Sequence, residues 1–475
     1  MTPATQEPGT GAFRAALPYL PVGLALLVIQ LDFFDLNLAI PRIAEELRVR
    51  VTDLQWLVSG YMLSLGALFI PAGKIGDLIG RKRTVLVGLA IFAAMSLASG
   101  LAPDAPLLIG FRILQGIGAG LIMPNAFALV GATTASDVRP KVMGILLAIA
   151  GIGTALGPIL GGLFTATIGW RWLFFINVPA VLLAVLFSRR IPEYFAGERR
   201  ESLRRLDWLG TLLIVAGLAF ATLGIDNVTN LGPASWLTWG PLALGLVLLV
   251  GFALHLRRTP SPLIAPALFR DVPFLLMGAA GSVLNLSVAV VTFAATLQVQ
   301  TIDGYSPEVA GLMFLGSSIG VALSGPAAGW LTSRFGARPV LAVTMLGAVL
   351  AIALVALAPN LPVYVVALGL AGFGGGLGWA VAQVGGQSYL PPERQGEGAG
   401  LLSMCMVVAG GLAVVVAGVV IEAISGTGTP TTAALDWTLV GLAALVALVA
   451  VLVITATSRR GRVGQNAIAP TDPAA

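Results

Sequence analysis

Residues 73–83 read Gly-Lys-Ile-Gly-Asp-Leu-Ile-Gly-Arg-Lys-Arg and stand between two apolar stretches, roughly 54–72 and 84–102. Each stretch is long enough to cross a bilayer as a helix. The eleven residues between them carry four basic side chains and one acid, which is the charge bias of a cytoplasmic loop. Three glycines let the backbone turn and approach a neighbouring helix closely. The stretch therefore predicts a tight cytoplasmic turn between two transmembrane helices.

Asp77 is the one acid of this turn, and two interpretations of it stay open. An acid among cations can form an ion pair at a helix end, and such a pair could hold or release a neighbouring helix. Alternatively, the stretch only fixes the topology, for which Arg and Lys are sufficient.

The composition is that of an integral membrane protein. The chain has 475 residues, of which 57% are hydrophobic and 10% charged, and its mean hydropathy is +0.94. Soluble domains carry about 25% charged residues.

The single cysteine, Cys405, excludes a disulfide within the chain and a cysteine-based metal cluster. The pI near 9.7 follows from basic residues in short loops and calls for no nucleic-acid partner. The first apolar stretch shows no signal-peptide cleavage pattern and continues as a full span.

Apolar stretches along the chain predict an all-α membrane protein with fourteen transmembrane helices. The expected spans are 17–39, 54–72, 84–102, 106–130, 140–166, 171–188, 208–225, 238–256, 273–299, 307–329, 339–358, 362–386, 399–421 and 435–457. With the N-terminus placed inside, most basic residues fall in loops on the cytoplasmic side. Both termini are therefore predicted to be cytoplasmic.

An internal repeat suggests two related halves. Residues 329–340 resemble 73–84, with Ser333 in place of the acid and fewer basic residues. Six spans precede about residue 190, six follow residue 273, and two lie between, which is a 6+2+6 arrangement typical of an alternating-access carrier. The predicted domains are a cytoplasmic tail (1–16), an N-terminal six-helix bundle (17–190), a linker with two extra helices (191–272), a C-terminal six-helix bundle (273–458) and a second cytoplasmic tail (459–475). The charged loop 189–207 is expected to carry a surface helix.

Two acids stand inside the first span. Asp32 and Asp35 are three residues apart, so on a helix they share a face. Two carboxylates in a dry cavity repel each other and are poorly solvated, so we expect at least one of them to exchange a proton near neutral pH. Alternatively Asp35, which is close to Pro41, is hydrated and only caps the outer vestibule.

Arg112 lies inside the fourth span, three residues before Gln115. A guanidinium does not lose its proton in a protein, so a buried one needs an acid, backbone carbonyls or water as partner. One interpretation makes Arg112 a fixed positive charge that tunes the acids or competes with the proton. The alternative is a purely structural network.

The fifth span carries small residues at every fourth position around Gly157 and Pro158. Such spacing allows close helix packing, and a proline bends a helix. Because this pattern is common in membrane helices, it is weak evidence when taken alone.

Together these stretches resemble the major facilitator superfamily. The residues 73–83 are similar to its signature loop, Arg112-x-x-Gln115 to its span-four motif, and Gly157-Pro158-x-x-Gly161-Gly162 to the span-five motif of its antiporters. The stretches 31–41, 55–61 and 169–179 resemble its fourteen-helix drug:proton antiporter family, and the resemblance covers nearly the whole chain. Asp35 departs from that family, in which its position is usually aliphatic or small.

The resemblance implies an export cycle in which protonation switches the carrier after cargo has bound between the halves. It implies proton coupling at Asp32, with Arg112 as electrostatic partner, and we add Asp35 to this site. The gating residues implied are Gly73, Asp77, Gly80, Arg81, Gly157 and Pro158. Polar or aromatic residues within or near spans are our candidates for cargo binding: Asn37, Tyr61, Gln115, Asn125, Asn285, Phe293, Trp379 and Gln383.

We therefore predict a monomeric, proton-coupled antiporter in the cell membrane that exports lipophilic drugs or antibiotics, cationic ones among them. Position 68, five residues before Gly73, is leucine, so the Gly-Lys pair belongs to no phosphate-binding loop, and no enzyme motif, cofactor site or metal site is apparent. Two alternatives stay open. One is a dedicated exporter of a single endogenous metabolite, such as a siderophore, a lipid or a self-made antibiotic. The other is a membrane scaffold or receptor that does not transport.

Overall fold

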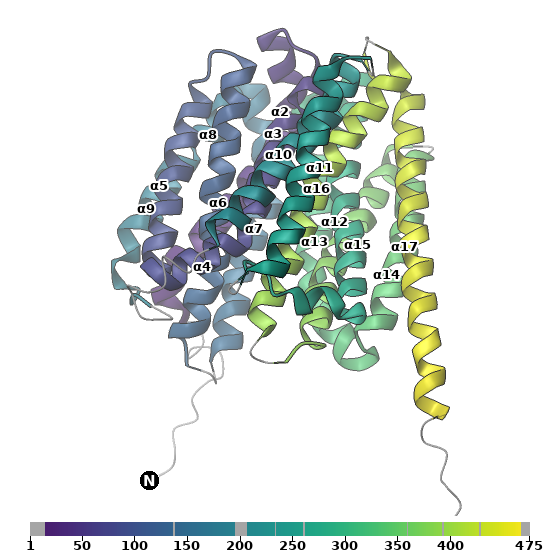
Figure 1. Ribbon diagram of the computed structural model, residues 1–475. Helices are drawn as coiled ribbons and strands as arrows, with labels where there is room; N and C mark the ends of the chain where they lie inside the picture. Colours follow the sequence, from purple (N-terminus) through teal and green to yellow (C-terminus); the bar gives the residue numbers. More distant parts are fainter. Residues whose placement is uncertain are drawn as a thin grey trace, which may run out of the picture.

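The computed structural model describes residues 15–135, 138–194, 207–232, 234–259, 262–358, 360–391, 394–426 and 429–466. These residues form one elongated bundle of helices (Figure 1). Most of the predicted tail 1–16, the end of the predicted tail 459–475, and the part of the loop 189–207 on which a surface helix was expected lie outside the described residues.

We refer to α2–α9 as the N-terminal half, α10–α11 as the linker pair and α12–α17 as the C-terminal half. The N-terminal half contains α2 (Leu20–Leu47), α3 (Trp56–Ala67), α4 (Phe69–Ile79), α5 (Arg81–Gly100), α6 (Ala105–Thr133), α7 (Arg139–Thr167), α8 (Arg171–Phe175) and α9 (Asn177–Phe187). The linker pair is α10 (Trp208–Asn230) and α11 (Trp236–Arg258). The C-terminal half contains α12 (Val272–Thr296), α13 (Pro307–Phe335), α14 (Ala337–Ala356), α15 (Leu361–Gln387), α16 (Gln395–Ser425) and α17 (Thr432–Asn466). Short 3₁₀ turns are η1 (Leu17–Tyr19), η2 (Val51–Gln55), η3 (Ser188–Arg190) and η5 (Pro266–Arg270), and η6 (Leu297–Ile302) is a π-helical extension of α12.

The helices account for all fourteen predicted apolar stretches. In the described part of the chain, 12 helices are long and apolar enough to cross a membrane, and the bent pair 51–79 raises the number to 13. The remaining stretch, 171–187, is a shorter apolar helix. The all-α membrane fold is thus confirmed, and the count is consistent with fourteen spans.

The predicted eleven-residue turn at 73–83 is wrong in its extent. Helix α4 continues to Ile79 and α5 begins at Arg81, so Gly80 alone separates them. Its φ of +106° is a conformation that glycine adopts without a steric penalty. Charged side chains are compatible with a helix whose end reaches water, so their presence did not mark a loop. The sequence also did not predict the 49° bend at Leu68, which separates α3 from α4.

The internal repeat is confirmed, and its spacing is 256 residues. Gly336 follows Gly80 by this interval, has a φ of +80°, and again stands alone between two helices. Helices α14, α15 and α16 begin 256 residues after α5, α6 and α7 (337 − 81, 361 − 105 and 395 − 139). The two halves therefore repeat their helices without insertions or deletions over this region.

The helix packing repeats at the same interval. A Cβ on Gly116 would lie 2.5 Å from the carbonyl oxygen of Tyr61, so α6 and α3 touch at their backbones. A Cβ on Gly372 would lie 2.3 Å from the carbonyl oxygen of Ser317, and both residues are 256 positions later. Since such contacts tolerate no side chain, they fix the same packing register in both halves.

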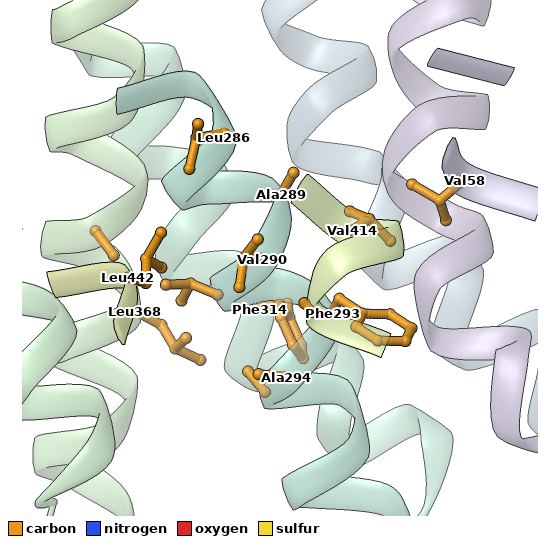
Figure 2. Close-up of a cluster of buried hydrophobic side chains, with 14 of the residues drawn as sticks. Val58, Leu286, Ala289, Val290, Phe293, Ala294, Phe314, Leu368, Val414 and Leu442 are labelled. Carbon is orange, nitrogen blue, oxygen red and sulfur yellow. The ribbon is translucent and has the colours of Figure 1, made fainter. Parts of the chain in front are cut away.

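The helix pairs α7–α13 and α3–α16 form most of the packing between the halves. Helix α7 packs on α13, where a Cβ on Gly311 would lie 2.4 Å from the carbonyl oxygen of Pro158. Helix α3 packs on α16, where a Cβ on Gly411 would lie 3.1 Å from the carbonyl oxygen of Ser59. Figure 2 shows Val414 of α16 and Val58 of α3 together with apolar side chains of the C-terminal half, all of which belong to one buried cluster.

We name the two ends of the bundle by residues. The Gly80 face is the end at which α4 meets α5, and the Arg50 face is the opposite end, at which α2 is followed by η2. Helix α17 descends to the end of the bundle at which the described chain begins, drawn at the bottom of Figure 1.

Candidate functional site

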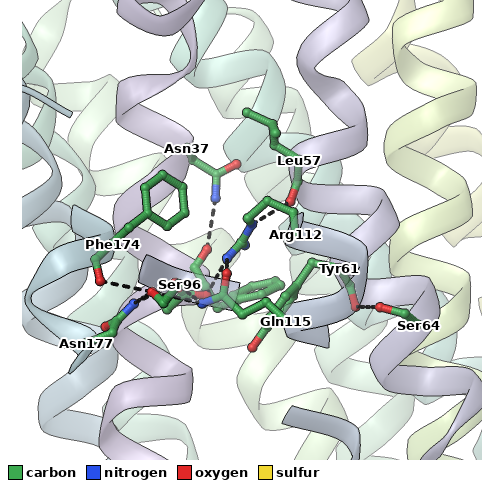
Figure 3. Close-up of polar contacts among 11 residues, drawn as sticks. Asn37, Leu57, Tyr61, Ser64, Ser96, Arg112, Gln115, Phe174 and Asn177 are labelled. Carbon is green, nitrogen blue, oxygen red and sulfur yellow. Dashed lines mark hydrogen bonds and ion pairs between the residues drawn. The ribbon is translucent and has the colours of Figure 1, made fainter. Parts of the chain in front are cut away.

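A buried ion pair occupies the middle of the N-terminal half. The Oδ2 atom of Asp32, on α2, lies 2.6 Å from Nη1 of Arg112, on α6. Both side chains are almost fully buried, at 2% and 1% exposure. Arg112 also donates from Nε to the backbone carbonyl of Leu57, at 3.1 Å (Figure 3). The guanidinium therefore links α2, α3 and α6, and of the partners that the sequence left open it has both an acid and a backbone carbonyl.

The other carboxylate oxygen of Asp32 accepts two amide hydrogen bonds. Gln115 and Asn177 each donate to Oδ1 at 2.9 Å. Asn177 also donates to the hydroxyl of Ser96, which donates to the backbone carbonyl of Phe174. Asn177 and Ser96 are functional candidates that the sequence analysis did not select. The motif Asn177-Val178-Pro179 was a signal for the first, whereas nothing in the sequence marked Ser96.

Aromatic rings close the site on the side of α3. The guanidinium carbon of Arg112 lies 4.4 Å from the centre of the Tyr61 ring, which places the cation over an aromatic face. The Phe33 ring lies 6.5 Å from that of Tyr61. The hydroxyl of Tyr61 is buried and makes no hydrogen bond with the described residues. Rings and amides together keep water away from the ion pair, which strengthens its electrostatics.

Asp35 is buried beside this network and lacks a full set of partners. It is 1% exposed, and its Oδ2 accepts no hydrogen bond from the described residues. The alternative in which Asp35 is hydrated does not hold in this conformation. The motif Gly157-Pro158-x-x-Gly161-Gly162 of α7 packs on the backbone of Asp35, because a Cβ on Gly161 would lie 2.4 Å from the carbonyl oxygen of Asp35. Gly157 is equally close-packed on Phe34, the preceding residue.

A second polar cluster lies at the Gly80 face. Arg81 Nη2 lies 2.5 Å from Asp77 Oδ1, and Arg81 Nη1 donates to the side-chain oxygen of Asn125 at 3.2 Å. Asn125, on α6, donates in turn to the backbone carbonyl of Ala72 at 2.8 Å. The predicted ion pair is thus formed, and it ties α4 and α5 to α6 within one half.

Two other glycines matter more to this cluster than Gly73 does. A Cβ on Gly76 would lie 1.7 Å from Asn125 Oδ1, whereas the space around Gly73 is open. Gly80 lies against the carboxylate of Glu193, which accepts hydrogen bonds from the backbone N–H groups of Lys82 and Arg83. Glu193 therefore caps the start of α5, as expected for an acid at a helix N-terminus.

The candidate cargo residues of the N-terminal half lie in different environments. Gln115 belongs to the Asp32 network and Asn125 to the Gly80-face cluster. Asn37 is 3% exposed and donates to the backbone carbonyl of Phe33. Tyr61 stacks on Arg112. Their role in cargo binding stays a prediction.

The candidates of the C-terminal half support its internal packing. Asn285 donates to the backbone carbonyl of Met406 at 2.8 Å, and Gln383 donates to the hydroxyl of Ser403 at 2.6 Å. Phe293 is 1% exposed within the apolar core, and Trp379 is half-buried. Among the described residues, no group of three or more His, Cys, Asp or Glu side chains could hold a metal ion.

The polar network has no counterpart in the C-terminal half. The residues 256 positions after Arg112, Gln115 and Ser96 are Leu368, Ala371 and Ile352, all buried. The residue 256 positions after Asp32 is Val288. The C-terminal half thus has the same helix packing register and lacks the ion pair.

The family described as Major Facilitator Superfamily matches this chain over residues 22–299 and 274–472. The chain belongs to the major facilitator superfamily. It is therefore a multi-pass transporter of small molecules in the cell membrane and not an enzyme, as the sequence predicted.

Several of its relatives are named as resistance or export proteins. The chain is 33% identical to the multidrug resistance protein Stp of Mycobacterium tuberculosis (strain CDC 1551 / Oshkosh), over 82% of this chain and 72% of that one. It is 32% identical to the puromycin resistance protein pur8 of Streptomyces alboniger, over 91% and 88%. It is 33% identical to the tetracenomycin C resistance and export protein of Streptomyces glaucescens, over 69% and 60%.

Solved transporters share the fold. The nucleoside transporter NupG aligns with a TM-score of 0.64 at 14% identity, over 93% of this chain and 99% of that chain. A bacterial homologue of the human lysosomal transporter Spinster, in an inward-facing and unoccupied conformation, aligns with a TM-score of 0.65 at 13% identity, over 95% and 98%. These similarities support the architecture of the major facilitator superfamily.

Proposed function

We propose that this protein is a proton-coupled antiporter that exports lipophilic drugs or antibiotics. The Gly80 face and both termini would lie in the cytoplasm, because the basic residues gather at that end. One chain supplies both halves of an alternating-access carrier, so we expect it to act as a monomer. The names of the relatives, which include multidrug resistance and tetracenomycin C export, support the cargo class.

The observation that carries the proposal is the buried pair of Asp32 and Arg112, present in one half and replaced by apolar residues in the other. A buried ion pair adds little stability compared with apolar side chains of similar size. Leu368 fills the position of Arg112 in a half of the same register. Because packing does not require the charges, a function of these charges is the better explanation for their presence.

Proton transfer to Asp32 would act as the switch. A neutral Asp32 no longer attracts the guanidinium of Arg112, and the ion-paired link between α2 and α6 is weakened. The amides of Gln115 and Asn177 also lose an anionic acceptor at Oδ1. Since Asp32 lies close to the α7 segment that packs on α13, this change can bias the arrangement of the two halves.

Asp35 supplies a second negative charge near the same site. A lipophilic cation would be attracted to the carboxylate whose Oδ2 lacks a partner. Release of that cation and uptake of a proton would then be coupled, because either one neutralises the acids.

The test is transport in proteoliposomes under an imposed pH gradient, with a fluorescent lipophilic cation as cargo. Movement driven by the gradient is expected for the parent protein and for Glu45→Gln, an exposed acid paired with Arg42 in the same helix. Asp32→Asn is expected to abolish it. Gradient-driven transport that survives in Asp32→Asn would contradict the assignment of the coupling acid.

A dedicated exporter of one metabolite is the second candidate. It is favoured by the relatives whose names state a single compound, such as tetracenomycin C and puromycin. If the parent protein moves no lipophilic cation or neutral drug under any gradient, this candidate replaces multidrug export.

A further inference from the structure

The Arg50 face carries an ion pair that joins the two halves. Arg50 directly precedes η2 in the N-terminal half, and its Nη1 is bound to the carboxylate of Glu422 on α16. Its Nη2 lies 2.5 Å from Asp53 Oδ1, so the guanidinium is shared between the halves. The side chain of Glu422 is 11% exposed and that of Arg50 is 39% exposed, so water and salt screen the pair from the Arg50 side only.

One turn deeper, the linker pair reaches the same junction. Gln55, the last residue of η2, donates from Nε2 to Oδ1 of Asp226 on α10 at 2.7 Å. The two residues are 2% and 7% exposed. Asp226 also lies within electrostatic range of Arg50. An acid of the linker pair is therefore buried against the N-terminal half.

The amide of Gln55 also fills the contact with α16. A Cβ on Gly418 would lie 1.4 Å from Oε1 of Gln55, so only glycine allows the amide to sit there. Gly418 and Glu422 are four residues apart and share a face of α16. The hydrogen bond that Gln55 donates to Asp226 therefore holds Gln55 against α16, one turn away from the Arg50–Glu422 ion pair.

The two faces of the bundle differ in how the halves are connected. At the Arg50 face the halves bind each other, through Arg50–Glu422 and through Gln300, which donates to the backbone carbonyl of Leu38 at 2.9 Å. At the Gly80 face, Lys74 of α4 donates to the carbonyl of Pro262, and the N–H of Ala265 donates to Glu397 of α16. Pro262 and Ala265 follow α11, so the segment after the linker pair lies between the halves there. The Arg50 face is therefore closed by direct contacts, and opening it requires that Arg50 and Glu422 separate.

We propose that α10 is a working part of the gate at the Arg50 face and that Asp226 is its positioning residue. By accepting the hydrogen bond of Gln55, Asp226 holds the Gln55 amide against Gly418, where α16 has no side chain. This contact keeps η2 against α16 and stabilises the Arg50–Glu422 pair. That this gate faces the outside of the cell, and that its opening releases cargo, rest on the proposed function. The linker pair would then set the equilibrium between closed and open states rather than act as a spacer.

The experiment measures how often the gate opens. Ser59 of α3 is fully buried, and its backbone lies against Gly411 of α16, so a cysteine there reacts only when α3 and α16 separate. Ser59→Cys is placed in a Cys405→Ser background, and right-side-out membrane vesicles are treated with a membrane-impermeant maleimide. Asp226→Asn should raise the labelling rate of Ser59→Cys about tenfold, because the side-chain amide of Gln55 loses its charged acceptor. Glu45→Gln, an exposed acid at the same face, should leave the rate unchanged.

Two further measurements separate opening of the gate from other causes of labelling. Glu422→Gln should also raise labelling, and the double variant with Asp226→Asn should show less than the product of the two effects, because both act on one gate. A cysteine at Ser99, buried within the N-terminal half, should stay unlabelled in every variant, which separates gate opening from unfolding.

An unchanged labelling rate in Asp226→Asn, or equal labelling at Ser99, would overturn the proposal. A rise seen only in inside-out vesicles would overturn the assignment of this gate to the outer side. The measurement uses neither a pH gradient nor cargo, so it can succeed where the proton-coupled transport assay fails.

Discussion

Asp32 and Arg112 form a buried ion pair at 2.6 Å, and the positions 256 residues later hold Val288 and Leu368. The repeat therefore provides a natural comparison between a charged and an apolar version of the same packing. The comparison predicts which substitutions the fold tolerates and which the transport cycle does not.

Removing one partner of the pair should destabilise the protein more than removing both. Arg112→Leu leaves the Asp32 carboxylate buried without its cation, which costs about 3–5 kcal/mol. Asp32→Val with Arg112→Leu copies the residues of the C-terminal half and should recover most of that loss, while transport stays absent. Thermal unfolding in detergent and the proteoliposome assay measure the two effects. A double variant less stable than Arg112→Leu would show that the charges are needed for folding.

Gly76 and Gly73 should respond oppositely to alanine. At Gly76 a Cβ would lie 1.7 Å from Asn125 Oδ1, so Gly76→Ala should displace Asn125 from Arg81 and cost about 1–3 kcal/mol. The space around Gly73 is open, and alanine there should stabilise α4 by up to about 1 kcal/mol. Thermal unfolding of both variants, measured in parallel, makes each the control for the other.

Transport by Gly73→Ala tests the gating role that the resemblance implies. If Gly73 contacts another helix in a different conformation of the cycle, this variant will be stable and yet inactive. Full activity would show that Gly73 is not a gating residue.

The sequence predicted the spans, the repeat and the buried charges because each depends on composition or on spacing along one helix. Asp32 and Arg112 could be paired in advance only through the family resemblance, because a buried guanidinium alone can take an acid, backbone carbonyls or water as its partner. Gln115 and Asn125 could not be assigned, because the direction of a polar side chain depends on how its helix is rotated against its neighbours. Gln115 faces Asp32, whereas Asn125 faces Arg81.

Contacts between distant segments were also beyond the sequence. Ser96 joins the site only because α5 and α9 pack side by side. Gly76 is critical only because Asn125 of α6 lies against it, and no pattern within 73–83 distinguishes it from Gly73. The role of α10 likewise depends on Asp226 meeting Gln55, 171 residues earlier.

Asp35 should select cargo by charge. Its carboxylate is buried with one oxygen lacking a partner, so a cationic cargo gains a neighbouring negative charge that a neutral cargo does not need. In Asp35→Asn we expect transport of a lipophilic cation to fall about tenfold or more, with transport of a neutral drug retained. Initial rates for both cargoes under the same pH gradient give the measurement. An equal loss for both cargoes would instead place Asp35 in proton coupling.

Asp207 should make the protein sensitive to acid at the Gly80 face. Burial raises the pKa of this carboxyl, but hydrogen bonds from the N–H of Gly210, the ring of His255 and the N–H of Leu263 lower it by more. The net pKa in the folded protein is below the ordinary value. Because the folded state binds this proton less well than the unfolded state does, Asp207 stabilises the fold above its unfolded pKa of about 3.9.

That contribution is lost as the pH falls through the lowered pKa. Asp207→Asn keeps an N-cap acceptor for α10 but has no charge to lose. The melting temperature of the parent protein should therefore exceed that of Asp207→Asn at about pH 5, and the margin should shrink below about pH 4. His255→Gln removes one of the hydrogen bonds that lower the pKa of Asp207. The melting temperature of His255→Gln should therefore exceed that of Asp207→Asn by less than the parent protein does at neutral pH. A margin for the parent protein that persists at pH 3 would show that Asp207 stabilises the junction of α10 and α11 by packing and not by its charge.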